Sequence, residues 1–174
     1  IGKTIEAGMI LREMLDRGEI DSFTVLCPPH LVDQWVEELA SKFDIDAVAV
    51  TSARARSLEQ GIALGDTLFA VHPYTVVSLD YIKADSRRES FAHACPKFVI
   101  VDEAHSCVGG SEKGTQQRFS LLQRLAEDPQ RHMLLPAAHF FKTMQGKHAP
   151  LGGQAAGGHK FQRLIHLAPP LLFQ

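Results

Sequence analysis

The residues Gly2, Lys3 and Thr4 have the types needed to bind phosphate and stand directly before a stretch with helical periodicity. They match the second half of the pattern G-x-x-x-x-G-K-[ST], in which backbone N–H groups, a lysine and a hydroxyl surround nucleotide phosphates. A helix that starts here would point its free N–H groups and its positive dipole end at an anion. Lys3 would contact the β- and γ-phosphates, and the Thr4 hydroxyl would hold Mg²⁺. The same residues also occur at ordinary helix starts, so alone they are weak evidence for a nucleotide site.

Asp102 and Glu103 form the second group that could do chemistry. They follow the apolar run 98–101, which is typical of a strand buried on both faces. In P-loop ATPases, the first carboxylate at such a place stabilises the Mg²⁺ shell, and the second polarises the attacking water. The alternative is an acidic strand end in solvent, but two ionised carboxylates at such a junction are costly without a cation or donors. Since Gly-Lys-Thr precedes them by about 100 residues, the combination favours a nucleotide site.

The composition sets few limits on function. The 174 residues are 45% hydrophobic and 22% charged, which is ordinary for a soluble α/β domain with its own core. The net charge of −2 does not point to a nucleic-acid partner, so such a partner has to be argued locally. We find neither a signal peptide nor a membrane-spanning stretch, and therefore expect a cytoplasmic protein without a membrane partner. The three cysteines and nine histidines lack zinc-site spacing, and we expect the cysteines to be small buried hydrophobes.

Apolar periodicity predicts strands and helices that alternate along the chain. Helices are expected over 4–17, ending at Gly18, and over a segment whose apolar side includes Leu31 and Leu39. The further expected helices are 53–60, 86–94 and 116–126, and the expected strands are 23–27, 47–50, 75–78, 98–101 and 132–135. This alternation indicates the α/β class, with a parallel sheet covered by helices on both faces.

Longer strings resemble known motors. Asp-Glu-Ala-His at 102–105, after Gly-Lys-Thr, resembles a superfamily 2 helicase with a DEAH box. The strings IGKTIEAGMI (1–10), VLCPPHLVDQW (25–35) and VVSLDYIK (76–83) resemble the Swi/Snf-type ATPases, in particular the bacterial RapA/HepA-like branch and the DrmD proteins of DISARM phage defence. The resemblance covers about residues 1–135 and four motifs in the family's order. It implies the first RecA-like lobe of a P-loop NTPase, which would bind ATP and Mg²⁺.

The resemblance also implies roles for single residues. Those implied in ATP chemistry are the catalytic Lys3, Asp102 and Glu103, the phosphate-binding Gly2, Lys3 and Thr4, the Mg²⁺ ligands Thr4 and Asp102, and the coupling residue His105. Those implied in contacts with double-stranded DNA are Pro29, His30 and Ser78. For Pro29 and His30 a plain turn between strand and helix is the alternative, and both interpretations can hold together. Partners implied beyond DNA are a second RecA-like lobe and unidentified defence-system or RNA-polymerase subunits.

Two further features allow more than one interpretation. Trp35 could stack on a base, but its helical position beside Leu31 and Leu39 favours a place in the core. The basic residues Lys83, Arg87 and Arg88 could line a rim near DNA or form a solvated helix face.

The composition changes after Leu135. All 20 acidic residues lie within 1–135, whereas about six would be expected in 136–174 at the upstream frequency. The family would continue with a T-A-T-P-like motif, but this chain has Pro-Ala-Ala-His-Phe at 136–140. We therefore expect a truncated first lobe at 1–135 and an atypical tail at 136–174, frameshifted or disordered, with a genuine but unusual linker as the alternative. Since the chain also starts at Ile1 within its ATP-binding loop, we expect a fragment that is inactive alone.

Three functions compete. The leading hypothesis is an ATP hydrolase that translocates on double-stranded DNA, with hydrolysis carried out in the complete parent protein. The second is a non-catalytic remnant that at most binds nucleotide or DNA weakly. The third is a P-loop ATPase that acts on protein. The Asp-Glu-Ala-His string, and the Pro-Pro-His string between the two ATP motifs, argue against this third function.

Overall fold

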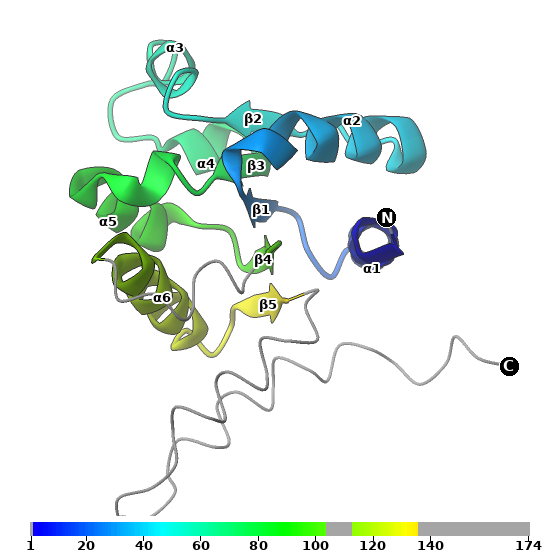
Figure 1. Cartoon of the computed structure of the whole chain (residues 1–174). Coiled ribbons are helices and arrows are strands. Elements are labelled where there is room, and N and C mark those ends of the chain that lie inside the picture. Colours follow the sequence, from blue (N-terminus) through cyan, green and yellow to red (C-terminus); the bar gives the residue numbers. More distant parts are fainter. Residues whose placement is uncertain (1, 104–112, 136–174) are drawn as a thin grey trace, which may run out of the picture.

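The computed structural model describes residues 2–103 and 113–135, which build one sheet of five parallel strands in the order β2-β3-β1-β4-β5. Strands that neighbour in the sheet but not in sequence require crossover connections, which helices supply in α/β proteins. Figure 1 shows the strands in this order from top to bottom. The strands are β1 (Phe23–Cys27), β2 (Val48–Val50), β3 (Tyr74–Ser78), β4 (Phe98–Val101) and β5 (His132–Leu134).

Helices cover both faces of this sheet. One face carries α1 (Gly2–Asp16) and α2 (Val32–Phe43), which lie on the same side of the strands in Figure 1. The other face carries α3 (Ala55–Glu59), α4 (Leu68–Val71), α5 (Asp85–Ala94) and α6 (Lys113–Ala126). Two short 3-10 turns, η1 (Pro29–Leu31) and η2 (Tyr81–Lys83), follow β1 and β3.

The core is divided by the sheet into two apolar clusters. Every residue of β1 and β4 is buried, so the two central strands contribute side chains to both clusters. Leu11 and Leu39 are fully buried on the side of α1 and α2, and Phe91 and Leu125 on the side of α5 and α6. The prediction of a RecA-like α/β lobe with helices on both faces is confirmed.

The predicted strands and helices are all present, with ends shifted by a few residues. α4 and the two 3-10 turns were not predicted, because single turns are too short to show a periodicity. In α4 the hydroxyl of Thr67 accepts from the N–H of Ala70 at 3.1 Å and so caps the turn. The division at residue 135 stays a prediction, and the tail 136–174 lies outside the described residues. Within the described residues, no helix has the length and apolar character needed to cross a membrane.

α1 approaches α2 closely at Gly8. A Cβ atom built on Gly8 would lie 2.2 Å from a ring carbon of Phe43, at the end of α2. One turn further along α1, Arg12 donates to the backbone carbonyl of Phe43 at 3.4 Å. The missing side chain at position 8 therefore allows α2 to pack on the helix that begins with the Gly-Lys-Thr residues.

Exchange of Gly8 for alanine should lower the free energy of unfolding by about 1–3 kcal/mol, because the new methyl group meets the Phe43 ring. In a Phe43→Ala background the same exchange should stabilise by up to about 1 kcal/mol, since alanine is the better helix former. Urea unfolding of the four variants measures this coupling. Equal effects of Gly8→Ala in both backgrounds would contradict the proposed contact.

Candidate active site

The carboxyl ends of β1, β3 and β4 meet at one edge of the sheet. The parallel register pairs Cys27 with Ser78 and Leu26 with Val101. Two backbone hydrogen bonds extend the pairing by one residue, from Leu79 N–H to the Cys27 carbonyl (2.9 Å) and from Asp102 N–H to the Leu26 carbonyl (2.8 Å). The residues that follow the three strands are therefore held side by side, although they are far apart in sequence.

Asp102 is held at this edge by three hydrogen bonds. Besides its amide bond to β1, its carboxylate oxygen Oδ1 accepts from the N–H of Glu103 at 2.9 Å. Its other oxygen, Oδ2, accepts from the indole N–H of Trp35 at 2.9 Å. Trp35 is only 2% exposed and belongs to the apolar cluster of α1 and α2. The interpretation of Trp35 as a core residue is confirmed, but its bond to Asp102 was missed, because the sequence separates the two residues by 67 positions.

Glu103 has a left-handed backbone conformation, with φ of +53°. For a residue with a Cβ atom this conformation costs roughly 1–2 kcal/mol, and such strain is concentrated at functional sites. Asp102 and Glu103 form a turn directly after β4, and Glu103 is half-buried. The two carboxylates therefore leave the sheet from consecutive residues with different backbone geometries.

The pKa of the buried Cys27 thiol is affected by the carboxylate of Asp102. Burial, and next to it the nearby carboxylate of Asp102, raise the pKa of Cys27 to about 12. The thiol therefore stays protonated at neutral pH and does not act as a nucleophile. This matches the expectation that the cysteine is a buried hydrophobe, and burial likewise raises the pKa of Cys95 to about 12.

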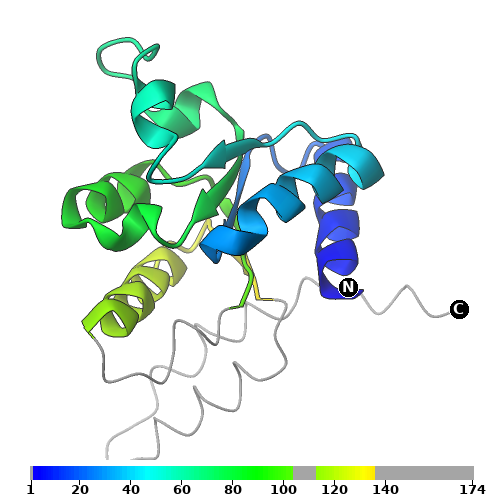
Figure 2. The same ribbon diagram turned by 45° about the horizontal axis from the view of Figure 1, so that its top comes forward.

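The first turn of α1 lies at the same edge of the molecule. α1 leads into β1 and packs on the sheet, so its N-terminal end lies near the strands' carboxyl ends. Figure 2 shows this end at the lower edge, where β4 also ends. Gly2, Lys3 and Thr4 open the helix, and its first turn contains no acidic residue. The fold thus places the first turn of α1 and Asp102 at one edge, and the roles of Gly2, Lys3, Thr4 and Asp102 stay predictions. His105 lies outside the described residues.

The residues present fit a Mg²⁺ ion. A hard cation prefers oxygen ligands, and carboxylate and hydroxyl oxygens are available from Asp102 and Thr4. The two hydrogen bonds to the Asp102 carboxylate leave further lone pairs on both oxygens. Among the ion pairs between side chains that the structure describes, none involves Asp102.

An open hollow of about 540 Å³ adjoins the same edge. It joins the residues after β1, the residues after β3 and Glu103, and its lining is Pro28, Pro29, His30, Leu31, Leu79, Asp80, Lys83, Glu103 and Arg118. Pro29 and His30 are exposed, as a contact with DNA requires. Ser78 is 1% exposed and its hydroxyl accepts from Asp80 N–H at 3.1 Å. A contact at this place would therefore come from the turn after Ser78.

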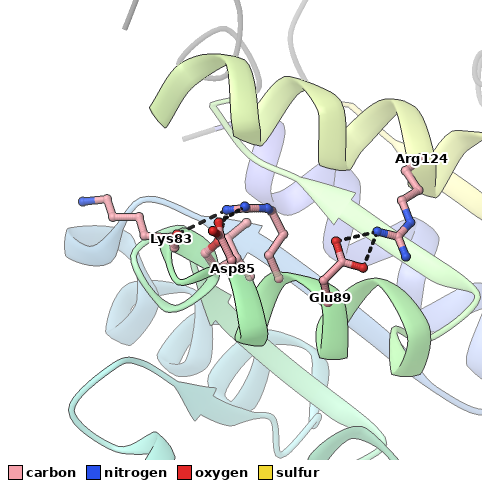
Figure 3. Close-up of polar contacts among 6 residues, drawn as sticks. Lys83, Asp85, Glu89 and Arg124 are labelled. Carbon is pink, nitrogen blue, oxygen red and sulfur yellow. Dashed lines mark hydrogen bonds and ion pairs between the residues drawn. The ribbon is translucent and has the colours of Figure 1, made fainter. Parts of the chain in front are cut away.

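The basic residues Lys83, Arg87 and Arg88 of η2 and α5 have partners within the protein, and of these three only Lys83 lines the hollow. Arg88 donates to the carbonyls of Ile82 (3.4 Å) and Lys83 (3.2 Å) and forms an ion pair with Asp85, as Figure 3 shows in part. The guanidinium of Arg87 lies 5.0 Å from the ring centre of Tyr81.

The ammonium of Lys83 pairs with Asp80. Figure 3 also shows Arg124 of α6 in contact with both carboxylate oxygens of Glu89 in α5, at 2.7 and 2.8 Å. These contacts join η2, α5 and α6 at the surface. The choice between a basic rim near DNA and a solvated helix face stays open.

The strain at Glu103 can be measured. A Glu103→Gly variant should be about 1 kcal/mol more stable than Glu103→Ala, because glycine adopts a positive φ without steric cost. The same pair of exchanges at Glu13, inside α1, should give the opposite order, since glycine disfavours a helix by about 1 kcal/mol. Urea unfolding measures both pairs of variants. If alanine is the more stable residue at both positions, Glu103 is not strained.

Comparisons with known proteins agree with this architecture. Residues 1–127 match the family described as SNF2-related domain. The RNA polymerase-associated protein RapA of Pseudomonas syringae pv. tomato is 30% identical over 128 residues, which are 73% of this chain and 13% of that protein. RapA of Stutzerimonas stutzeri is 31% identical over 128 residues, with the same shares covered. RapA of Proteus mirabilis is 29% identical over 138 residues, which are 79% of this chain and 14% of that protein.

The chain thus spans about one seventh of the length of these curated relatives. The family match includes the first turn of α1, the strand ends that meet at the carboxyl edge, and both carboxylates after β4. With this match over most of its length, the chain belongs to the family of SNF2-related domains.

Proposed function

We propose that the chain is the ATP-binding lobe of a DNA-dependent ATPase that translocates along double-stranded DNA and remodels what is bound there. The observation that carries the proposal is the meeting of two elements at one edge of the sheet. These are the anchored Asp102–Glu103 pair after β4 and the N-terminal end of α1. A helix N-terminus attracts phosphate, and a fixed carboxylate beside it suits the metal that accompanies nucleotide phosphates.

Each residue of the site would have one task. Gly2, Lys3 and Thr4 would bind the phosphates, with Lys3 neutralising the charge that develops at the β- and γ-phosphates. Thr4 and Asp102 would hold Mg²⁺, which when bound offsets negative charge on the phosphate oxygens. Glu103 would accept a hydrogen bond from the attacking water and orient it.

Coupling of this site to a polymer is the second part of the proposal. His105 would link the ATP site to the following motif, as the resemblance implies. Pro29, His30 and the turn after Ser78 line or adjoin the hollow that Glu103 also lines. A DNA backbone bound there would therefore lie next to the water-activating residue. N–H groups at the start of α2 could donate to its phosphates.

Hydrolysis in this family of motors takes place between two RecA-like lobes, so we propose that this lobe alone is a poor ATPase. A missing arginine finger lowers turnover by about 10³–10⁵ in related P-loop systems. A role in phage defence, implied by the resemblance to DrmD proteins, belongs to this proposal. So does an RNA-polymerase partner, which the names of the RapA relatives suggest.

A non-catalytic remnant is the second candidate. The sequence Pro-Ala-Ala-His-Phe at 136–140 stands where the family's coupling motif is expected, and a lobe without that motif would bind nucleotide without productive turnover. Extension of the reading frame on the source DNA separates the candidates. A second lobe downstream supports the motor, and an early stop supports the remnant.

Exchanges of Lys3 and Glu103 should separate nucleotide binding from hydrolysis. In a form of the protein that includes a second lobe, Lys3→Ala should abolish ATP turnover, because the cation that neutralises the phosphates is lost. Glu103→Gln should stop hydrolysis but leave nucleotide affinity largely unchanged, since the amide keeps the shape but cannot act as a base. Phosphate release and binding of a fluorescent ATP analogue measure the two effects. Turnover of Glu103→Gln at the wild-type rate would refute its role.

Double-stranded DNA should stimulate turnover, and DNA affinity should fall steeply with salt because the contacts go mainly to phosphates. His30→Glu should weaken DNA binding several-fold, because it places a negative charge in the hollow. Gln130→Glu is the matched control, since it adds the same charge at an exposed site just before β5, at the opposite edge of the sheet. Fluorescence anisotropy across a salt series measures both variants. Equal weakening by both would exclude the hollow as the DNA site.

A further inference from the structure

Apolar packing alone does not explain why the indole N–H of Trp35 donates a hydrogen bond to Asp102. Trp35 is 2% exposed and is surrounded by the apolar cluster of α1 and α2. A buried indole N–H needs an acceptor. Here the acceptor is a carboxylate oxygen at 2.9 Å. Hydrogen bonds to an ionised group are about twice as strong as those between neutral groups.

This bond determines the orientation of the carboxylate. Asp102 has two side-chain bonds, one per oxygen, with Trp35 on Oδ2 and the N–H of its own neighbour Glu103 on Oδ1. The hydrogen bond from the Glu103 N–H joins neighbouring residues of one turn, so it can persist when the carboxylate rotates slightly. The indole belongs to another element, α2, whose packing against the sheet holds it in place. Within the described residues, Trp35 is therefore the external donor that defines the plane of the carboxylate.

We propose that Trp35 is a positioning residue that orients the carboxylate of Asp102 for Mg²⁺. This inference rests on the proposed function, because it assumes that Asp102 holds the metal. Donors that orient metal ligands from outside the coordination sphere typically change metal affinity by 10–100-fold when they are removed. The same size of effect is expected here, because the lone pairs left on Asp102 keep their direction only while the indole N–H is present.

The test separates the hydrogen bond from the packing. Trp35→Phe keeps an aromatic ring in the cluster but removes the donor. Replacement of the indole by a benzothienyl group, which has sulfur in place of N–H at nearly the same volume, is the second variant if Trp35→Phe does not fold. This replacement is specific, because Trp35 is the only tryptophan of the chain. Val36→Ala, in the same helix, is the control for a general loosening of α2, because Val36 packs against the same apolar cluster.

The measurement is binding of a fluorescent ATP analogue to the complete 174-residue chain, first without divalent metal and then in a Mg²⁺ titration. We expect unchanged affinity without metal and a 10–100-fold higher Mg²⁺ concentration at half-saturation in the variants that lack the N–H. Val36→Ala should leave the Mg²⁺ midpoint unchanged.

Each deviation has a distinct meaning. Equal Mg²⁺ midpoints in wild type and Trp35→Phe, or a loss of affinity that is the same with and without metal, would overturn the positioning role while leaving nucleotide binding intact. Absence of any nucleotide binding, or of any Mg²⁺ dependence, in the wild type would refute the proposed function instead.

Discussion

The parallel pairing of β1 with β4 is the constraint on which the arrangement of the candidate site depends. The bond from the Asp102 amide to the Leu26 carbonyl continues this pairing one residue beyond β4. Because parallel strands end at the same edge, the acidic residues come to lie next to the turn that follows β1. β1 also pairs with β3, so the turn after Ser78 joins them. A shift of register by one residue would move each of these groups to the other side of its strand.

The site combines a rigid base with locally unfavourable features. β1 and β4 are buried along their whole length, which leaves them no freedom to adjust. On this base the chain places a partly buried carboxylate, a buried thiol beside it and a residue with positive φ. Each of these costs free energy in isolation. The carboxylate is stabilised by its donors, and the protonated thiol avoids a second negative charge.

The elements that flank the site, α1, η2 and α5, are positioned by different contacts. α1 is placed by close packing, since the absence of a side chain at Gly8 admits the ring of Phe43. η2 and α5 are placed by the apolar cluster, into which Tyr81, Ile82 and Phe91 are buried. The bonds from Arg88 to the carbonyls of Ile82 and Lys83 add polar contacts between η2 and α5.

The sequence by itself determined the fold class and most of the element positions. The runs 23–27 and 98–101 are apolar at every or nearly every position, and a strand buried on both faces requires this pattern. The two helices that flank β1 show apolar residues at helical spacing, which depends only on local chain geometry. The residue types at positions 2–4 and 102–103 likewise indicated phosphate and metal chemistry, because few side chains can perform it. The short helix α4 was not predicted, because a single helical turn is too short to show an apolar periodicity.

Only the tertiary structure decided which residues meet. The bond between Trp35 and Asp102 joins the first turn of α2 to the end of β4, and no local pattern specifies such a distance. The DNA contact expected at Ser78 and the turn after it stays a prediction. The burial of the Ser78 side chain was not visible in the sequence, because burial depends on the neighbouring strands. The alternatives for Lys83, Arg87 and Arg88 were equally compatible with the sequence. Their partners lie nearby in the sequence, within 80–85, but which contacts form depends on how η2 and α5 fold, and no periodic pattern shows this.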